Sequence, residues 1–308
     1  MDDMADAAHR AKKDDLADAA INTYRYLRIA LIVLVAALAA SVVLERIHAT
    51  HLQDSISAYY YTPTHSIFVA TFVGMGVCLI VLKGSNDTED VLLNIGGILA
   101  PIVALVPTTE PSSLYGSSAL TITRARILIG NNVVALLIAG VVAIVIAYLV
   151  ERSKRHGLTV SQIRTPDKVG LAVAAALIVV GGVTYWKKRQ FFLDHAHTSS
   201  ATAMAAILAL VVVLNAQRAH ARHKPGYRFL YGLAVGIMAL GVVPVLAHLQ
   251  WDSFRPWNFV LESIEMGGFI TFWIMQTFEL WDLGVDPVPV KYLLPGTKAH
   301  PKPELPTG

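Results

Sequence analysis

The residues best suited to chemistry in this 308-residue chain lie in short polar stretches between long apolar blocks. One such stretch, LQDSISAYYYTPTHSIF at residues 52–68, contains Asp54, Ser55, Ser57, Tyr60 and His65. Carboxylates, hydroxyls and imidazoles accept or donate hydrogen bonds, and carboxylates and imidazoles also exchange protons. A loop that merely connects two helices needs turn residues and little else. The stretch therefore predicts an ordered lid over a binding site.

Two further stretches supply histidines and carboxylates. FLDHAHTSS contains His195 and His197, and PWNFVLESIEMGGF contains Glu262 and Glu265. If a helix begins near Trp257, the two glutamates lie roughly 7 and 12 Å along it and share one face. A carboxylate at the centre of a membrane helix costs about 2.5–3.5 kcal/mol, so it usually faces a partner or a water-filled cavity. The glutamates thus predict a polar site inside the bundle, beneath the lid.

Each of these features also has a structural interpretation. Arg126, near the start of another apolar block, is a candidate counter-ion for the glutamates, and that set is either a clamp between helices or a ligand site. The tyrosine run 59–61 is typical of an aromatic belt at the headgroup level. His195 and His197 flank a helix start where Asp194 or Thr198 could act as the cap. For each of these features, the functional and the structural interpretation stay open at this point.

The elements that must position these residues are membrane helices. Hydrophobic residues make up 55% of the chain and charged residues only 15%, against about 25% charged in soluble domains. The apolar residues form eight blocks long enough to cross a hydrocarbon core about 30 Å thick. The sequence predicts an all-α polytopic bundle with spans at 27–44, 66–82, 91–106, 127–150, 169–186, 199–216, 229–249 and 259–280.

The positions of Lys and Arg predict how the bundle is threaded. With the N-terminus in the cytoplasm, 18 of the 25 basic residues fall in cytoplasmic segments and 7 in outer loops. The positive-inside rule therefore predicts that both termini are cytoplasmic, although the run 187–189 opposes this arrangement. The polar stretches described above then lie on the outer side. The functional centre is expected beneath the lid, among spans two, four, six and eight.

Three regions and a faint internal repeat complete the predicted organisation. Residues 1–26 form a charged cytoplasmic segment, 27–282 the transmembrane domain, and 283–308 a Pro-rich cytoplasmic tail that is expected to be disordered. Spans one and five are each followed by an acidic residue, His and Ser, and spans three and seven share a late Val-Pro pair. A parallel 4+4 duplication would explain this echo, but membrane helices also resemble one another through shared composition alone, which is the favoured explanation.

Composition also narrows the cofactors and partners. Cys78 is the only cysteine, which excludes an intramolecular disulfide and disfavours a thiolate metal cluster. No histidine pair has the helical spacing of a zinc site, so neither a metal nor another cofactor is expected. The basic residues lie between apolar blocks, where they act as topology signals and give no reason to expect a nucleic-acid partner. Membrane lipids and a small-molecule or lipid ligand are the expected partners.

Three functions fit these residues, and the sequence identifies no catalytic residue. The first is an outward-facing pocket that binds or transports a small molecule or lipid head group. The second is an intramembrane metal-dependent hydrolase that acts on lipid, with histidine and carboxylate ligands. The third is a structural or accessory membrane protein. The first is favoured, and the chain is expected not to be an enzyme.

The segments SISAYYYTPTHSIFVATFVGMGVCLIVLKG and LLNIGGILAPIVALVP resemble a group of uncharacterised multi-pass membrane proteins from actinobacteria. The outer S-I-S-x-Y motif ahead of a Phe-rich span is more distantly similar to the DUF998 and Frag1/DRAM-type families. The resemblance covers roughly residues 50–110 and, faintly, DHAHTSSATAM. It implies a helical integral membrane fold and leaves the activity open.

Overall fold

The computed structural model describes residues 2–49, 51–108, 122–154, 165–221, 224–250 and 256–281. Within these ranges the chain forms nine α-helices and one short 3₁₀ helix, with no strand. In chain order they are α1 (Asp2–His48), η1 (Ser57–Tyr61), α2 (His65–Val81), α3 (Asp87–Leu105), α4 (Ile122–Lys154), α5 (Thr165–Lys187), α6 (Arg189–Ala221), α7 (Pro225–Ala239), α8 (Val242–Gln250) and α9 (Trp257–Glu279).

Each predicted span lies on a single helix, to within one residue at its ends, except 229–249, which is divided between α7 and α8. Within the described residues, the prediction of an all-helical fold is confirmed. Among the described residues, six segments are long and apolar enough to cross a membrane: 18–48, 87–105, 127–150, 168–187, 189–221 and 225–250. The last of these contains a break, because α7 ends at Ala239 and α8 begins at Val242. Helix α2 is apolar but shorter, with 17 residues.

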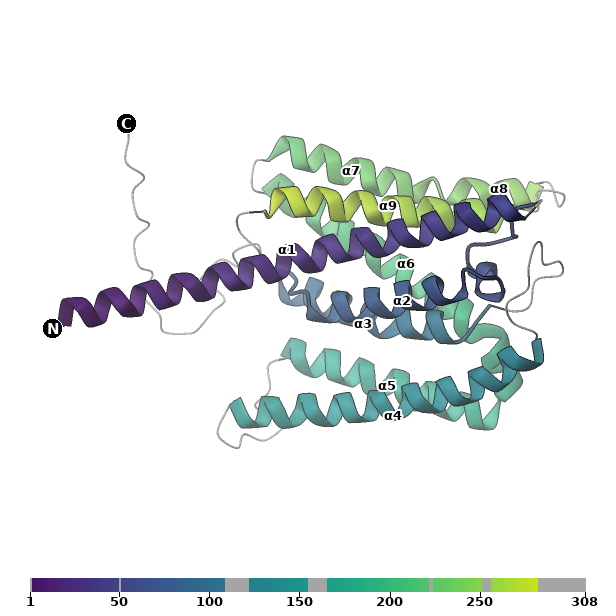
Figure 1. Ribbon diagram of the computed structural model, residues 1–308, viewed down its shortest axis with the longest axis horizontal. Helices are drawn as coiled ribbons and strands as arrows, with labels where there is room; N and C mark the ends of the chain where they lie inside the picture. The colour runs from purple at the N-terminus through teal and green to yellow at the C-terminus, as the bar shows by residue number, and fades with distance from the viewer. Residues whose placement is uncertain are drawn as a thin grey trace.

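The helices run roughly parallel and form three layers (Figure 1). One layer contains α1, α7, α8 and α9, a middle layer contains α2, α3 and α6, and the third is the α4–α5 hairpin. The hairpin joins the rest through contacts of α3 and α6 with α5 and of α3 with α4. The chain alternates in direction, so η1, the end of α3 and the start of α9 meet at one end of the bundle, called here the η1 end. The start of α3 lies at the opposite end.

Helix α1 is longer than the span it was predicted to contain. It runs without interruption from Asp2 to His48 and projects beyond the bundle at its N-terminal end (Figure 1). The predicted boundary at residue 26 therefore falls inside one continuous helix. The predicted tail, 283–308, lies outside the described residues.

Close packing of α2 on α3 depends on glycine. A Cβ on Gly97 would lie 2.7 Å from the carbonyl oxygen of Gly76 and 2.6 Å from Cγ1 of Ile80. Small residues at such a crossing let two backbones approach closely, which is how membrane helices gain packing energy. The contact holds the middle of α3 against the second half of α2.

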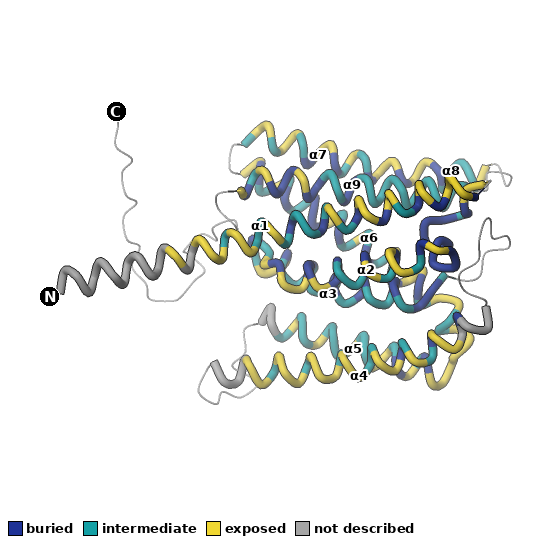
Figure 2. Tube along the Cα trace, in the orientation of Figure 1, coloured by how far each residue is buried: buried dark blue, intermediate teal, exposed yellow. Residues whose placement is uncertain are grey.

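The outer surface of the bundle is strongly apolar. Figure 2 shows that α4 and α5 are mostly exposed or intermediate along their length. The exposed side chains of α4 include large hydrophobic residues over several turns: Ile138, Val141, Val142, Val145, Ile146, Leu149 and Val150. A continuous apolar face of this kind is unfavourable in water and favourable against lipid chains. The surface therefore agrees with the membrane character of the helices.

Candidate functional site

The lid predicted at residues 52–65 folds into η1 and packs into the η1 end of the bundle. Ser55, one residue before the N-cap Ile56, stabilises the first turn of η1, because its Oγ accepts a hydrogen bond of 2.9 Å from the N–H of Ala58. The carbonyl of Asp54 accepts one of 3.0 Å from the N–H of Phe259, which ties the lid to the first turn of α9. These two contacts hold Ser57 against both α6 and α9.

Ser57 joins a histidine and a glutamate from different helices. Its N–H donates to Oε2 of Glu262 at 2.8 Å, and its Oγ lies 3.1 Å from Oε1 of the same carboxyl group. The Oγ also lies 3.0 Å from Nε2 of His197. On the other side of the ring, Nδ1 of His197 lies 2.8 Å from the carbonyl oxygen of Val106, at the end of α3. We call Ser57, His197 and Glu262 the Ser57 cluster.

Counting donors fixes the charge of the Ser57 cluster. The carbonyl of Val106 requires a proton on Nδ1 of His197, so in a neutral ring Nε2 is an acceptor. The single proton of the Ser57 hydroxyl can then serve only one of its two contacts. The second contact needs a proton on the Glu262 carboxyl group or a second proton on the ring. Either arrangement leaves the cluster with no net charge, which suits its burial.

A cavity of about 520 Å³ adjoins the Ser57 cluster. Ser57, His197 and Glu262 form part of its wall, and Glu265 lies one helical turn further along α9. Most of the remaining wall is apolar and comes from η1, α2, α3, α6, α7 and α9, including Phe72, Met75, Met204, Met238, Met266 and Phe269. The cavity is thus polar near η1 and apolar beyond it.

The cavity reaches the side of the bundle. Thr198, Thr202 and Ala206 of α6 line it and are also exposed, and so is Ala239 at the end of α7. These exposed wall residues lie on α6 and beside the α7–α8 break. A molecule can therefore enter between α6 and this break without passing through the lid.

Glu265 differs from Glu262 in having no partner among the described residues. No hydrogen bond or ion pair links its carboxyl group to any other residue that the structure describes. Room for the group comes from Gly241 in the α7–α8 break, since a Cβ there would lie 2.9 Å from Oε1 of Glu265. The structure thus confines one carboxyl group to a mainly apolar wall without neutralising it.

The tyrosines of the lid point inward, which corrects their interpretation as a headgroup belt. Tyr59, Tyr60 and Tyr61 are 1%, 1% and 4% exposed. Tyr60 packs edge-on against His65 and Phe68, with ring centroids 4.3 and 6.1 Å away. Burial raises the pKa of Tyr60 to about 12. These rings are the core of the lid.

The other predicted site residues stand apart from the cavity. Nδ1 of His65 lies 2.8 Å from the carbonyl oxygen of Tyr60, so this histidine fastens the lid to the start of α2. His195 is exposed, stacks on Phe191 and contacts the carbonyl of that residue. Neither histidine lines the cavity.

Arg126 belongs to α4, but its side chain lies outside the described part of the structure, as does that of Arg124. No described residue of α4 lines the cavity. Helix α4 packs instead on α5 and α3. The expected wall of spans two, four, six and eight is therefore corrected to α2, α3, α6, α7 and α9, with η1 above them.

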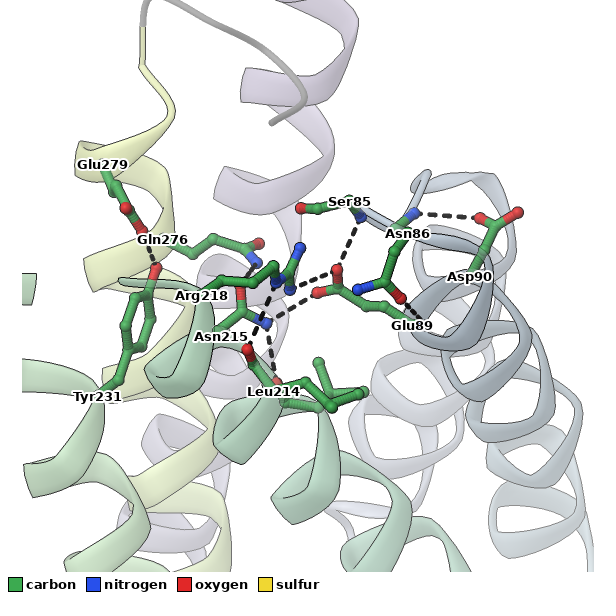
Figure 3. A network of polar contacts seen from close by, with 12 residues as sticks. Ser85, Asn86, Glu89, Asp90, Leu214, Asn215, Arg218, Tyr231, Gln276 and Glu279 are labelled. Atoms are coloured by element: carbon green, nitrogen blue, oxygen red, sulfur yellow. Dashed lines mark hydrogen bonds and ion pairs between the residues drawn. The ribbon is translucent and has the colours of Figure 1, made fainter. Parts of the chain in front are cut away.

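A second buried polar cluster, at the opposite end of the bundle, was not anticipated (Figure 3). Glu89 of α3 is 1% exposed and accepts hydrogen bonds from Asn215 at 2.8 Å and from Arg218 at 2.6 Å. Asn215 accepts in turn from Gln276, which accepts from Arg28. We call these five residues the Glu89 cluster. Asn215 and Gln276 could have indicated this cluster from the sequence, because each is a polar residue within an apolar span.

Two hydrogen bonds at the N-terminus of α3 fix the position of Glu89. Asn86 is the N-cap, and its side chain accepts a 2.9 Å bond from the N–H of Glu89. Glu89 reaches back to accept a 2.7 Å bond from the N–H of Ser85. This reciprocal arrangement resembles a capping box. The acidic group at the start of α3 thus caps the helix and supplies the carboxylate of the cluster.

No metal site is formed by the described residues, which contain no group of three or more His, Cys, Asp or Glu side chains that could hold an ion. The ligand set that a metal-dependent hydrolase would need is therefore not found in this part of the chain. The serine and histidine of the Ser57 cluster offer a different chemistry, which needs no metal.

Comparison with known proteins gives no functional information about this chain. The predicted resemblance to the actinobacterial membrane proteins and to the DUF998 and Frag1/DRAM-type families stays a prediction. No protein-family model, curated protein or solved structure matches this chain.

Proposed function

We propose that this protein binds or transports a small amphipathic molecule or a lipid head group in the outer half of a membrane bundle. The observation that carries the proposal is the cavity of about 520 Å³, which is polar at the Ser57 cluster and apolar beyond it. Its size falls within the range of about 300–1,000 Å³ that is common for ligand sites. An amphiphile matches the two ends of such a cavity, with its head group at η1 and its apolar part among the methionines.

The proposed setting is the bacterial cell membrane, with eight spans and both termini in the cytoplasm. Support comes from the eight apolar blocks, the alternating direction of the helices and the distribution of Lys and Arg. In this arrangement α7 and α8 form one broken span, and the η1 end faces outward. Reporter fusions after residues 85, 160, 222 and 300 are expected to report the cytoplasm, and an external signal at 160 or 222 would overturn the threading. A 4+4 duplication stays a prediction.

Entry from the lipid follows from the same setting. The exposed wall residues of α6 and α7 belong to helices that would cross the bilayer, so the opening beside them would face lipid chains. A lipid or an amphiphile dissolved in the membrane can reach the cavity by this route without first entering water. The lid then separates the bound head group from the aqueous phase.

The test is to fill the cavity and measure binding. Ala205 lines the cavity on α6, and a Trp there would occupy part of its volume. Ala174 lines a separate apolar cavity of about 300 Å³ between α3, α4 and α5, so Ala174→Trp is the matched control. Native mass spectrometry of the purified protein, titrated with dodecanoylglycerol, counts the bound molecules in each variant.

We expect saturable binding to the wild-type protein and to Ala174→Trp, and its loss in Ala205→Trp. If all three proteins bind equally, or none binds, the cavity is not the site and the proposal fails. The accessory or structural role then becomes the better explanation. Thermal unfolding of each variant shows whether a loss of binding reflects a loss of fold.

Hydrolysis of a lipid ester is the second candidate, favoured by one observation. Oγ of Ser57 lies 3.0 Å from Nε2 of His197, and Val106 orients the ring through Nδ1. In such a reaction Oγ attacks the carbonyl carbon while its proton passes through His197 to the leaving alcohol, and water then releases the acyl group. However, the N–H of Ser57, which could stabilise the oxyanion, is bonded to Glu262.

A fluorophosphonate probe distinguishes the two candidates, because it forms a covalent bond only with an activated serine. We expect no labelling of the wild-type protein. Stoichiometric labelling that is lost in Ser57→Ala would make hydrolysis the leading function.

A further inference from the structure

The carboxyl group of Glu265 gives the cavity a chemical preference. Among the described residues, the titratable side chains that line the cavity are His197, Glu262 and Glu265, and none of these described lining residues is Lys or Arg. The donor count leaves His197 and Glu262 neutral as a pair. When ionised, Glu265 therefore gives the cavity a net charge of minus one, with no cation of the described protein bonded to it.

A second acceptor lies beside Glu265. From the position that a Cβ on Gly241 would occupy, Oε1 of Glu265 is 2.9 Å away and the carbonyl oxygen of Met238 is 3.0 Å away. The two oxygens come from different helices, α9 and α7, and both lie beside the break at Gly241. The Met238 carbonyl accepts the N–H of Gly241 at 3.0 Å and keeps a second lone pair. Carbonyls at broken membrane helices are recurrent cation ligands in transporters. The break thus adds negative potential to that of the carboxylate.

The apolar wall suits a cation that carries a hydrophobic body. Met75, Met204, Met238 and Met266 are flexible and polarizable, so they adapt to irregular ligands. Phe72 and Phe269 also line the cavity, and aromatic rings attract alkylammonium groups. An ionised carboxylate is unfavourable in such surroundings, and a bound cation removes that penalty. An anionic head group would instead meet the same carboxylate and be repelled.

We propose that the cavity selects cationic amphiphiles, such as alkylamines and alkyl quaternary ammonium compounds, and that Glu265 is the counter-ion of their head group. This inference rests on the proposed function, since it assigns a ligand class to the same cavity. Gly241 is the residue that keeps space for the counter-ion.

The experiment compares head groups on one alkyl chain. Dodecyltrimethylammonium, dodecanoylglycerol and dodecanoate are titrated by native mass spectrometry into the purified full-length protein and its variants. We expect the ammonium compound to bind the wild-type protein about tenfold more tightly than the neutral glyceride, since a desolvated ion pair replaces a lone carboxylate. Dodecanoate is expected to bind most weakly.

Glu265→Gln should remove the preference for the ammonium compound and leave glyceride binding within about twofold, because the amide keeps the shape but not the charge. Gly241→Ala should weaken ammonium binding selectively, since its methyl group displaces the carboxylate. Gly236→Ala is the matched control, because its Cβ would meet nothing within 4 Å.

The outcomes separate this inference from the proposed function. If Glu265→Gln leaves the head-group preference unchanged while Ala205→Trp abolishes binding of both probes, the cavity is the site and Glu265 is not the counter-ion. If Ala205→Trp has no effect on either probe, both proposals fail. Retained thermal stability of Glu265→Gln and Gly241→Ala excludes misfolding as the cause of a lost preference.

Discussion

The Ser57 cluster and the Glu89 cluster each contain a glutamate that accepts hydrogen bonds, but their surroundings differ. Glu89 accepts directly from Asn215 and Arg218 of α6. Glu262 accepts from Ser57, whose hydroxyl in turn contacts His197 of α6. His197 precedes Asn215 by 18 residues on α6, which separates the clusters by roughly 27 Å along the helix. The Ser57 cluster adjoins a cavity, whereas the Glu89 cluster is closed by Arg218, Asn215 and the main chain of Ser85.

This difference distinguishes a buried carboxylate that stabilises the fold from one that is available to a ligand. In the Glu89 cluster an ion pair of 2.6 Å neutralises the carboxylate, and the cluster ties α1, α3, α6 and α9 together. In the Ser57 cluster the charge is neutralised by a shared proton, and no described residue forms an ion pair with Glu265 beside it. We therefore expect changes at Glu89 to affect stability and changes near Ser57 to affect binding.

The largest effect is expected at the Glu89 cluster. Arg218→Ala strands a carboxylate that is 1% exposed, and removing one partner of a buried ion pair costs about 3–5 kcal/mol. Thermal unfolding in mild detergent should show a large decrease in stability or no folded protein. Arg228→Ala is the control, because Arg228 is exposed and should change stability by less than about 0.5 kcal/mol. Equal unfolding temperatures for both variants would show that the Glu89 cluster does not stabilise the fold.

A smaller effect is expected from Glu262. Glu262→Ala leaves the N–H of Ser57 without its acceptor and should cost about 1–3 kcal/mol. Glu262→Gln should cost less, because the amide oxygen can still accept from Ser57. Hydrogen exchange of residues 55–62 should accelerate in the alanine variant and hardly change in the glutamine variant. A glutamine variant as unstable as the alanine variant would show that the cluster requires an ionised carboxylate.

Double-mutant cycles should show that the two clusters are independent. Ser57→Ala and Asn215→Ala act on different clusters, so their effects on the free energy of unfolding should add within about 0.5 kcal/mol. Ser57→Ala and His197→Ala remove the same contact, so their sum should exceed the effect of the double variant. Coupling between Ser57 and Asn215 would instead indicate one network through α6.

The smallest effect concerns the lid at high pH. Burial raises the pKa of Tyr60 to about 12, above its usual value of 10.0. Above pH 10 the unfolded chain therefore loses this proton before the folded protein does. The stability that neutral Tyr60 contributes is complete below pH 10 and is lost as the pH rises to about 12. Tyr60→Phe should show a shallower loss of stability over this interval, measured by chemical unfolding, and equal slopes would disprove the assignment.

The sequence predicted the helices because long apolar blocks have few ways to fold in a membrane. It also singled out Ser57, His197 and Glu262, since polar residues beside or within apolar spans need partners. The inward position of the tyrosine run could not be predicted, because amphipathic rings suit a lipid interface and a protein core alike. The Glu89 cluster was missed because Glu89 and Arg218 lie near helix ends, where charged residues are usually solvated.

The helical class, the apolar surface and the polar residues that need hydrogen-bond partners all follow from the amino-acid sequence. The contacts between those polar residues follow from the way the helices pack. Ser57 and His197 are 140 residues apart, and Ser57 and Glu262 are 205 apart. Their contact depends on how α6 and α9 pack beneath η1, and the space for Glu265 depends on the break at Gly241. These are properties of packing between helices, which the periodicity of a single helix does not encode.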